Sequence, residues 1–205
     1  MASEAELREL RLRAARILKS QACLDVRFQL DKVGIQTYMY SYIGSAISDD
    51  NVHLTIGTGH SYNPATNTIT FNAVDVDAPT IVHEATHAII DATHVGQKFT
   101  TGVHEAAAYL AETVYALNAN YGSHQIDVPY LAPSLYDLAR RIKAFNSQNK
   151  SGLFVCPASD TFSIIAILGN SKLGMDVDHT EVMDGINEAP HRGLLGHMAL
   201  ESRKK

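Results

Sequence analysis

Apolar residues recur every three to four positions in three long stretches of this chain, residues 3–20, 80–95 and 103–120. This period is typical of helices that bury one face, so each stretch is predicted to be a helix. Pro79 directly precedes the second stretch and Gly96 follows it. Proline near a helix start and glycine after a helix end are common boundary residues, and they set the limits of this predicted helix.

A different pattern lies between the first two helices. Residues 52–57 and 67–72 are rich in β-branched side chains and flank a segment rich in Gly, Asn and Pro. Two strands joined as a hairpin are the prediction for this region. Residues 38–48 stay ambiguous, because their tyrosines recur every second residue as on a strand, whereas their small residues also fit a helix packed in the core.

The second half of the chain is predicted to be helical, with helices over residues 134–146, 161–170 and 180–187. The pattern as a whole predicts an α+β fold, mostly helical, with a small antiparallel or mixed sheet before the central helices. We expect one domain over residues 1–205. It divides into a β-containing lobe over about 1–79, central helices over about 80–120, and a helical lobe over about 121–205.

Composition limits the classes of partner that we expect for this chain. Apolar residues make up 45% of the chain, charged residues 19%, and the net charge is −5. No basic stripe indicates a nucleic-acid partner, and no apolar run approaches the roughly 20 residues that span a membrane. The first 20 residues lack the apolar core of a secretory signal, so we expect a cytoplasmic protein, with non-classical export left open. The two cysteines, Cys23 and Cys156, are expected to be reduced thiols. The sequence leaves the oligomeric state undetermined.

The segment VHEATHAIID, residues 82–91, carries the candidate chemistry. His83 and His87 are four residues apart, so on a helix both imidazoles lie on one face and can bind one zinc ion. Glu84 lies about 100° round the helix from His83, beside such an ion. The flanking residues are apolar, and two histidines and a glutamate on a buried helix are costly unless they are paired or bind a metal. This HExxH pattern therefore predicts a zinc site.

A third protein ligand is needed, and the chain offers several candidates. His94 follows His87 by seven residues, which places it about 10 Å further along the same helix and out of reach of the same ion. The next predicted helix carries Glu105 and Glu112, which share one face. The spacing alone leaves both glutamates as candidates.

Residues 80–115 resemble the active-site region of thermolysin-type gluzincin metallopeptidases. The likeness covers HExxH, the Thr-His-Ala at residues 86–88, and Asp91 four residues after the second histidine. In that family a loop and a second helix follow, and a Glu-Ala pair supplies the third zinc ligand. The resemblance places Glu105 in that position. It implies a minimal zincin-like metallopeptidase fold and one zinc ion per chain, bound by His83, His87 and Glu105.

Two positions depart from the family pattern. His104 stands where the family has Asn, and Tyr109 stands where the family has an Asp that hydrogen-bonds the first zinc histidine. A ligating histidine usually donates its second N–H to an acceptor. The Tyr109 hydroxyl, Glu112 or a backbone carbonyl can serve here. We therefore place His104, Glu112 and Asp91 around the ligands.

The resemblance also implies a mechanism. Glu84 would act as the general base that takes a proton from a water molecule on the metal and passes it to the leaving amine. The oxyanion needs a further hydrogen-bond donor, which the family supplies from a Tyr and a His. Candidates for that donor are His104, Tyr109, His124, Tyr130 and His179. Of these, Tyr109 and His179 are the predicted catalytic residues beside Glu84.

The strand before the central helix has a counterpart in the family, an edge strand that binds extended peptide by strand addition. The corresponding residues here are Thr68, Ile69, Thr70, Phe71 and Asn72. An ordinary sheet edge explains them equally well. We expect the cleft to run between the sheet lobe and the C-terminal helices.

Three functions remain open from the sequence. The first is a zinc-dependent hydrolase that cleaves amide bonds in a peptide or protein substrate. The second is a gluzincin-like effector or regulatory protease with a narrow target. The third is a catalytically weak zinc-binding module. A fourth protein ligand would favour the third function, because structural zinc sites are closed and catalytic sites keep one position open. His104 is the local candidate for that ligand.

Overall fold

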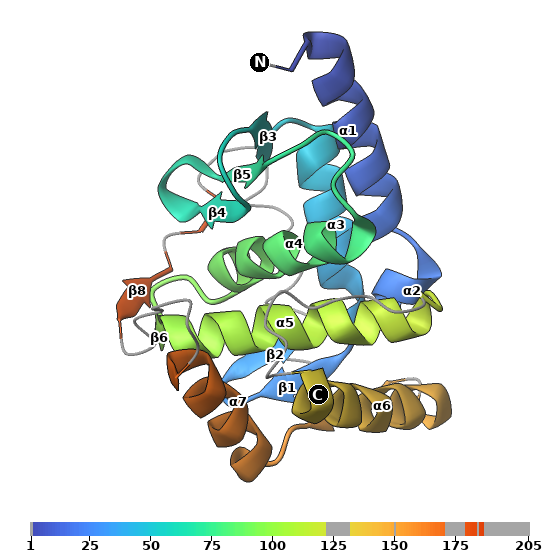
Figure 1. Ribbon diagram of the computed structural model, residues 1–205, viewed down its shortest axis with the longest axis vertical. Helices are drawn as coiled ribbons and strands as arrows, with labels where there is room; N and C mark the ends of the chain where they lie inside the picture. Colours follow the sequence, from blue (N-terminus) through green and yellow to red (C-terminus); the bar gives the residue numbers. More distant parts are fainter. Residues whose placement is uncertain (1, 122–131, 150, 171–178, 184, 187–205) are drawn as a thin grey trace.

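Helices dominate the computed structural model, which describes residues 2–121, 132–149, 151–170, 179–183 and 185–186. It is an α+β fold with small mixed sheets, as predicted (Figure 1). The helices are α1 (Glu4–Leu18), α2 (Gln21–Leu24), α3 (Thr37–Ser48), α4 (Ala78–Thr93), α5 (Thr101–Asn118), α6 (Ala132–Gln148) and α7 (Ala158–Asn170), with a 3-10 turn η1 (Pro64–Thr66). The helices predicted from residues 3–20, 80–95, 103–120, 134–146 and 161–170 are all confirmed.

Local chemistry explains where the central helices start. The Asp77 side chain accepts a hydrogen bond from the backbone N–H of Thr80, and Pro79 lies in the first turn of α4. Thr100 caps α5 in the same way through the N–H of Val103. Such caps satisfy N–H groups that have no partner inside the helix. They fix the register of the two helices that carry the candidate ligands.

A three-stranded sheet precedes α4. Its strands are β3 (His53–Ile56), β4 (Ser61–Asn63) and β5 (Thr68–Phe71), in the order β3-β5-β4. β3 and β5 pair in parallel, so the predicted hairpin between them is wrong. The hairpin is instead formed by β4 and β5, which pair antiparallel. The turn-rich segment therefore contains a strand that the local pattern did not indicate.

Two further sheets join distant parts of the chain. β1 (Phe28–Leu30) pairs with β2 (Val33–Ile35) and with β7 (Phe154–Val155), and β6 (Lys98–Thr100) pairs with β8 (Thr180–Val182). The helix predicted over residues 180–187 is therefore wrong. The C-terminal region contributes strands to both sheets. The prediction that this region is entirely helical is therefore wrong.

The ambiguous segment 38–48 is helix α3. Tyr40 and Tyr42 are buried, whereas Tyr38 is 39% exposed. A helix turns successive residues by about 100°, so a two-residue period does not keep side chains on one face. Tyr40 and Tyr42 are thus core residues of a helix, and the three tyrosines do not form a strand face.

α4 and α5 lie alongside each other across the middle of the molecule, where nearly all of their apolar side chains are buried (Figure 1). The sheet β3-β5-β4 and helices α1 and α3 lie on the α4 side, and α6 and α7 pack against α5. The two central helices are therefore held from both sides. Within the described residues, no helix is both long and apolar enough to cross a membrane.

Candidate metal centre

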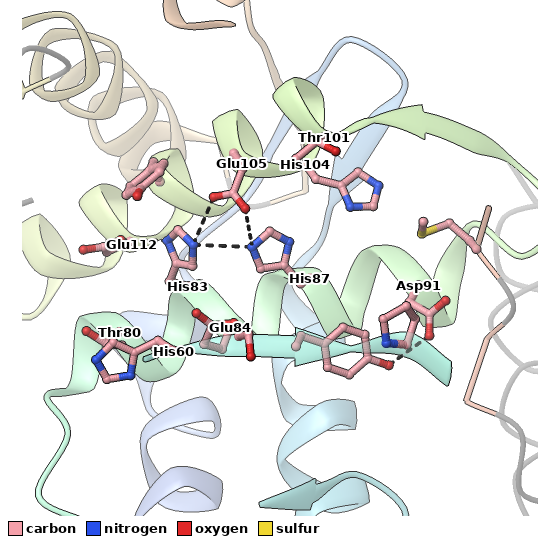
Figure 2. A pocket seen from close by; sticks show the side chains of 15 residues that line it. His60, Thr80, His83, Glu84, His87, Asp91, Thr101, His104, Glu105 and Glu112 are labelled. Atoms are coloured by element: carbon pink, nitrogen blue, oxygen red, sulfur yellow. Dashed lines mark hydrogen bonds and ion pairs between the residues drawn. The ribbon is translucent and has the colours of Figure 1, made fainter. Parts of the chain in front are cut away.

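Three side chains from the two central helices converge on one point. His83 and His87 lie one turn apart on α4 and face Glu105 on α5 (Figure 2). The two histidine Nε2 atoms are 3.4 Å apart. The Glu105 carboxylate oxygens lie 3.5 Å from Nε2 of His83 and 3.6 Å from Nε2 of His87. The structure thus brings together the three ligands predicted from the sequence.

These distances fit a metal ion better than mutual hydrogen bonds. Good N–H···O hydrogen bonds measure about 2.7–3.2 Å, and all three separations are longer. Two ligand atoms held tetrahedrally at about 2.0–2.1 Å from zinc lie about 3.3–3.4 Å from each other. Among the described residues, no Lys or Arg lines the surrounding pocket, which carries four carboxylates, those of Glu84, Asp91, Glu105 and Glu112. The donor set and the surplus of negative charge both suit a divalent cation.

Glu112 fixes the first histidine. Nδ1 of His83 donates to Oε2 of Glu112 at 2.9 Å, and both side chains are buried. This bond places the lone pair of a neutral ring on Nε2, which is the atom that faces His87 and Glu105. Tyr109 packs edge-on against the same ring, with the centroids 4.6 Å apart. Of the acceptors considered from sequence, Glu112 is therefore the one bonded to His83.

The charges of the three ligands are strongly coupled. Burial lowers the pKa of His83, but the neighbouring carboxylates of Glu105 and Glu112 outweigh burial and raise the pKa to about 10. Burial lowers the pKa of His87 to about 4. Burial also acts to raise the pKa of Glu105, yet the neighbouring histidines lower it to about 2. His87 and Glu105 are thus already in the deprotonated state that a metal requires.

Glu84 differs from the other carboxylates at this centre. It follows His83 on α4, is 4% exposed and lines the same pocket. Burial raises its pKa to about 7. Its Oε2 atom is buried and has no hydrogen-bond partner among the described residues. A buried carboxylate oxygen without a partner is costly, which makes Glu84 a candidate to act on a molecule that enters the cleft.

His104 does not complete the ligand set. Among the residues that the structure describes, the group whose ligand atoms lie within 4.8 Å of one another consists of His83, His87 and Glu105. The His104 ring lies 6.1 Å from that of His87 and 5.6 Å from that of Phe99. Burial lowers its pKa to about 4. Its neutral, buried side chain forms part of the pocket wall.

The pocket itself has a volume of about 480 Å³ and runs between the sheet and the two central helices. Its walls come from β4 and its flanks, α4, the start and middle of α5, and the segment after β8: His60, Ser61, Tyr62, Pro64, Thr80, His83, Glu84, His87, Asp91, Thr101, His104, Glu105, Tyr109, Glu112 and Met183. No described residue of α6 or α7 is among them, so the expected cleft against the C-terminal helices is wrong.

The prediction that residues 68–72 form the substrate-binding strand is also wrong. Residues 68–71 form β5, which lies between β3 and β4 and is paired on both sides. It cannot accept a further strand. The strand at the sheet edge beside the pocket is β4, and none of Thr68, Ile69, Thr70, Phe71 and Asn72 lines the pocket.

Asp91 links α4 to two other segments that border the pocket. It is 1% exposed and lies one turn beyond His87. Its Oδ2 accepts a hydrogen bond from the Tyr62 hydroxyl of β4 at 2.9 Å. Its Oδ1 accepts one from the backbone N–H of Gly185 at 3.0 Å. The residue predicted near the ligands is therefore a structural link to the sheet and to the segment after β8.

The remaining predicted donors are not brought to the centre. His179 is exposed and precedes β8, where its backbone carbonyl accepts a bond from the N–H of Thr101; it does not line the pocket. His124 and Tyr130 lie outside the described residues. His94 is held at the end of α4 by Thr93 and the carbonyl of Ile90, away from the ligands as expected.

Sequence reasoning missed the histidine on the sheet side of the pocket, His60. It directly precedes β4 and lines the pocket on its sheet side. Its ring packs near Phe71 of β5, with the centroids 6.0 Å apart. No motif surrounds it in the sequence; the glycine before it, Gly59, was a sign only of a turn. Its place at the site follows from the pairing of β4 with β5.

Comparisons with known proteins add no relative to this picture. No protein-family model matches the chain, and neither a curated protein nor a solved structure matches it. The function must be argued from the site.

Proposed function

We propose that the protein is a zinc-dependent hydrolase that cleaves amide bonds in a peptide or protein substrate. The observation that carries the proposal is the convergence of His83, His87 and Glu105 in a pocket that Glu84 also lines. The HExxH spacing and the resemblance of residues 80–115 to gluzincins support it. The proposal includes a minimal zincin-like arrangement of α4 and α5.

Zinc bound by these three residues would polarise a substrate carbonyl and lower the pKa of a coordinated water to about 7. The protein's own contribution is made by Glu84. Its Oε2 has no partner among the described residues, so it is free to accept a proton from water. Its pKa of about 7 matches the protonation range that general-base catalysis needs near neutral pH. The same carboxyl group then returns the proton to the leaving nitrogen.

The two alternatives differ in what they require. A structural zinc module needs a closed ligand set, and the group of ligand atoms in the described residues has three members. This favours a hydrolase over a module. An effector or regulatory protease with a narrow target needs the same metal centre. It differs from a broad peptidase in the range of substrates that it cleaves.

The test compares Glu84→Gln with the wild type after both are loaded with one zinc ion per chain. Glutamine keeps the shape of the side chain and removes the base. Hydrolysis of a broad library of unstructured peptides should fall by at least about a hundredfold, with zinc content unchanged. Glu9→Gln, an exposed position on α1, is the matched control and should keep full activity. Equal activity in Glu84→Gln and wild type would refute the mechanism.

A wild type that binds zinc but cleaves no substrate would lead to a different conclusion. If zinc binds in one equivalent but neither peptides nor unfolded proteins are hydrolysed, the broad hydrolase is wrong. A search for a narrow protein target would then follow, with Glu84→Gln as the inactive partner in each assay.

A further inference from the structure

The pocket runs along α4, and the predicted metal ligands stand near its middle. Four lining residues follow one another at intervals of about one helical turn: Thr80, His83, His87 and Asp91 (Figure 2). Each helical residue adds about 1.5 Å along the axis, so the level midway between the two histidines lies about 9 Å from that of Asp91. One residue of an extended peptide spans about 3.3–3.6 Å. One or two residues of a substrate therefore fit between the ligands and Asp91.

Hydrogen bonds across the pocket close it at the Asp91 end. The helix wall of the pocket consists of α4 and α5, and the sheet wall consists of β4 with the residues beside it. Asp91 on the helix wall accepts a bond from the Tyr62 hydroxyl on the sheet wall at 2.9 Å. It accepts another from the N–H of Gly185 at 3.0 Å, two residues after Met183, which also lines the pocket. A peptide that continues past this end must break one of these bonds.

The segment after β8 is held in this position by its backbone. The N–H of Met183 donates to the carbonyl of Gln97, and its own carbonyl accepts a bond from the N–H of Gly96. Gly185 has a φ of +83°, and a Cβ there would lie 2.9 Å from a methyl carbon of Val95. Glycine suits both the backbone conformation and the close packing. The end of the pocket is therefore a built part of the fold.

The closed end also carries a carboxylate that the proposed reaction does not use. Glu105 is a predicted ligand and Glu84 is the proposed base. Glu112 holds His83. Asp91 has none of these roles, and it is buried, where charges interact strongly over several ångströms. Of the two ends of a peptide, this end of the pocket therefore favours the ammonium group of the amino terminus over the carboxylate of the other end.

We propose that the protein is an exopeptidase that removes one or two residues from the free amino terminus of a peptide, with the terminal ammonium group next to Asp91. This inference rests on the proposed function and assigns its substrate class. Water adds to the carbonyl carbon of the first or second residue, and Glu84 takes the proton from the water. The C–N bond then breaks, and the leaving nitrogen takes that proton. The rest of the peptide leaves toward Thr80, at the other end of the pocket.

The first test measures the effect of the ammonium charge on binding, without turnover. Leucine hydroxamate is compared with the analogue in which a hydrogen replaces the amino group, so both hold zinc through the same group. At about pH 6.5 the amino group is largely protonated, because the ordinary pKa of an α-amino group is about 7.7–8.0. Calorimetry on the zinc-loaded protein should show at least about tenfold tighter binding of leucine hydroxamate.

The second test measures how many residues fit at the closed end. Alanine residues are added one at a time to the amino side of leucine hydroxamate, and every compound keeps one terminal ammonium group. The affinity should hold for the first added residue. It should fall by at least about tenfold when the second is added, because the peptide then meets the hydrogen-bonded end of the pocket.

Asp91→Asn keeps an oxygen acceptor and removes the charge. The affinity ratio between leucine hydroxamate and its deaminated analogue should fall to near unity, and the use of a ratio cancels any general loss of packing. Asp75→Asn is the matched control, because Asp75 is exposed before α4 and does not line the pocket. It should keep the wild-type ratio. If Asp91→Asn does not fold, the two measurements on the wild type decide.

Cleavage sites are then mapped by mass spectrometry on one peptide in three forms: with a free amino terminus, N-acetylated, and cyclised head to tail. Only the free form should be shortened, by one or two residues at a time. Internal cleavage, or equal cleavage of the cyclic form, would keep the proposed function and overturn this inference.

Equal affinity for leucine hydroxamate and its deaminated analogue would also overturn it, as would a constant affinity along the alanine series. If no hydroxamate binds the zinc-loaded wild type and no peptide is cleaved, the proposed function itself fails. If the hydroxamates bind as expected but no form of the peptide is cleaved, the hydrolase is wrong and the exopeptidase with it.

Discussion

The helix wall and the sheet wall of the pocket place their polar residues by different means. On the helix wall, His83 and His87 are one turn apart on α4, and Glu112 of α5 holds the first of them at 2.9 Å. On the sheet wall, His60 is placed by a glycine turn and by strand pairing, with no hydrogen bond of its own among the described residues. The first wall is ordered by helix geometry, and the second depends on the path of the chain.

This difference is expected to separate metal binding from substrate alignment. The helix wall should control how tightly the metal is held, because all three ligands belong to it. The sheet wall should control how well the substrate is aligned. Substitutions on the two walls are therefore expected to change different measurements.

The largest effect is expected from a ligand. His87→Ala should abolish stoichiometric zinc binding and remove the stabilisation that zinc provides, since metal binding is coupled to folding. Zinc content by mass spectrometry and the shift of the melting temperature on chelation measure this. His94→Ala, on the same helix but outside the ligand group, is the control and should keep one zinc ion. Full zinc content in His87→Ala would disprove the ligand assignment.

A smaller effect is expected from Glu112, which contacts the ligand His83 but is not itself a ligand. Glu112→Ala removes the acceptor for Nδ1 of His83 and should lower zinc affinity by about ten- to a hundredfold while the stoichiometry stays at one. Competition with a chelator of known affinity gives the value. Glu112→Gln keeps an oxygen acceptor and should recover part of the loss. If Glu112→Ala binds zinc as tightly as the wild type, the bond does not orient His83.

The smallest effect is expected on the sheet wall. Gly59 has a φ of +77° and open space where a Cβ would lie, so Gly59→Ala meets no clash and only backbone strain. The free energy of unfolding should fall by about 1–2 kcal/mol, with zinc affinity unchanged. Gly34→Ala, in open space on β2 without a positive φ, is the matched control for denaturant unfolding and should cost less. A loss of zinc affinity in Gly59→Ala would show that the two walls are not independent.

The sequence predicted the helix wall well because its information is local. The four-residue spacing of His83 and His87 determines their common face once α4 forms, and the apolar residues around them determine α4. Glu105 was found through the gluzincin-like pattern that follows. Glu112 remained one of several acceptors, because its contact with His83 depends on how α5 packs on α4.

The sheet wall was not predictable in the same way. β3 and β5 pair in parallel, and neither composition nor periodicity gives strand order, so the edge position predicted for residues 68–72 is wrong. The segment 180–187 was predicted to be a helix, although Thr180 and Val182 are β-branched; pairing with β6 makes residues 180–182 a strand. His60 lacked any motif, and its place in the pocket follows only from the folded arrangement.

The hydrogen bonds of Asp91 also limit how wide the cleft can open. One oxygen of this carboxylate bonds Tyr62 at the sheet edge, and the other bonds the backbone of Gly185 beyond β8. Widening the cleft by moving either segment away from α4 breaks a hydrogen bond to a charged acceptor, each worth about 1.5–3 kcal/mol. A single side chain of the ligand-bearing helix thereby limits the thickness of what can enter, which suits an extended chain better than a folded surface.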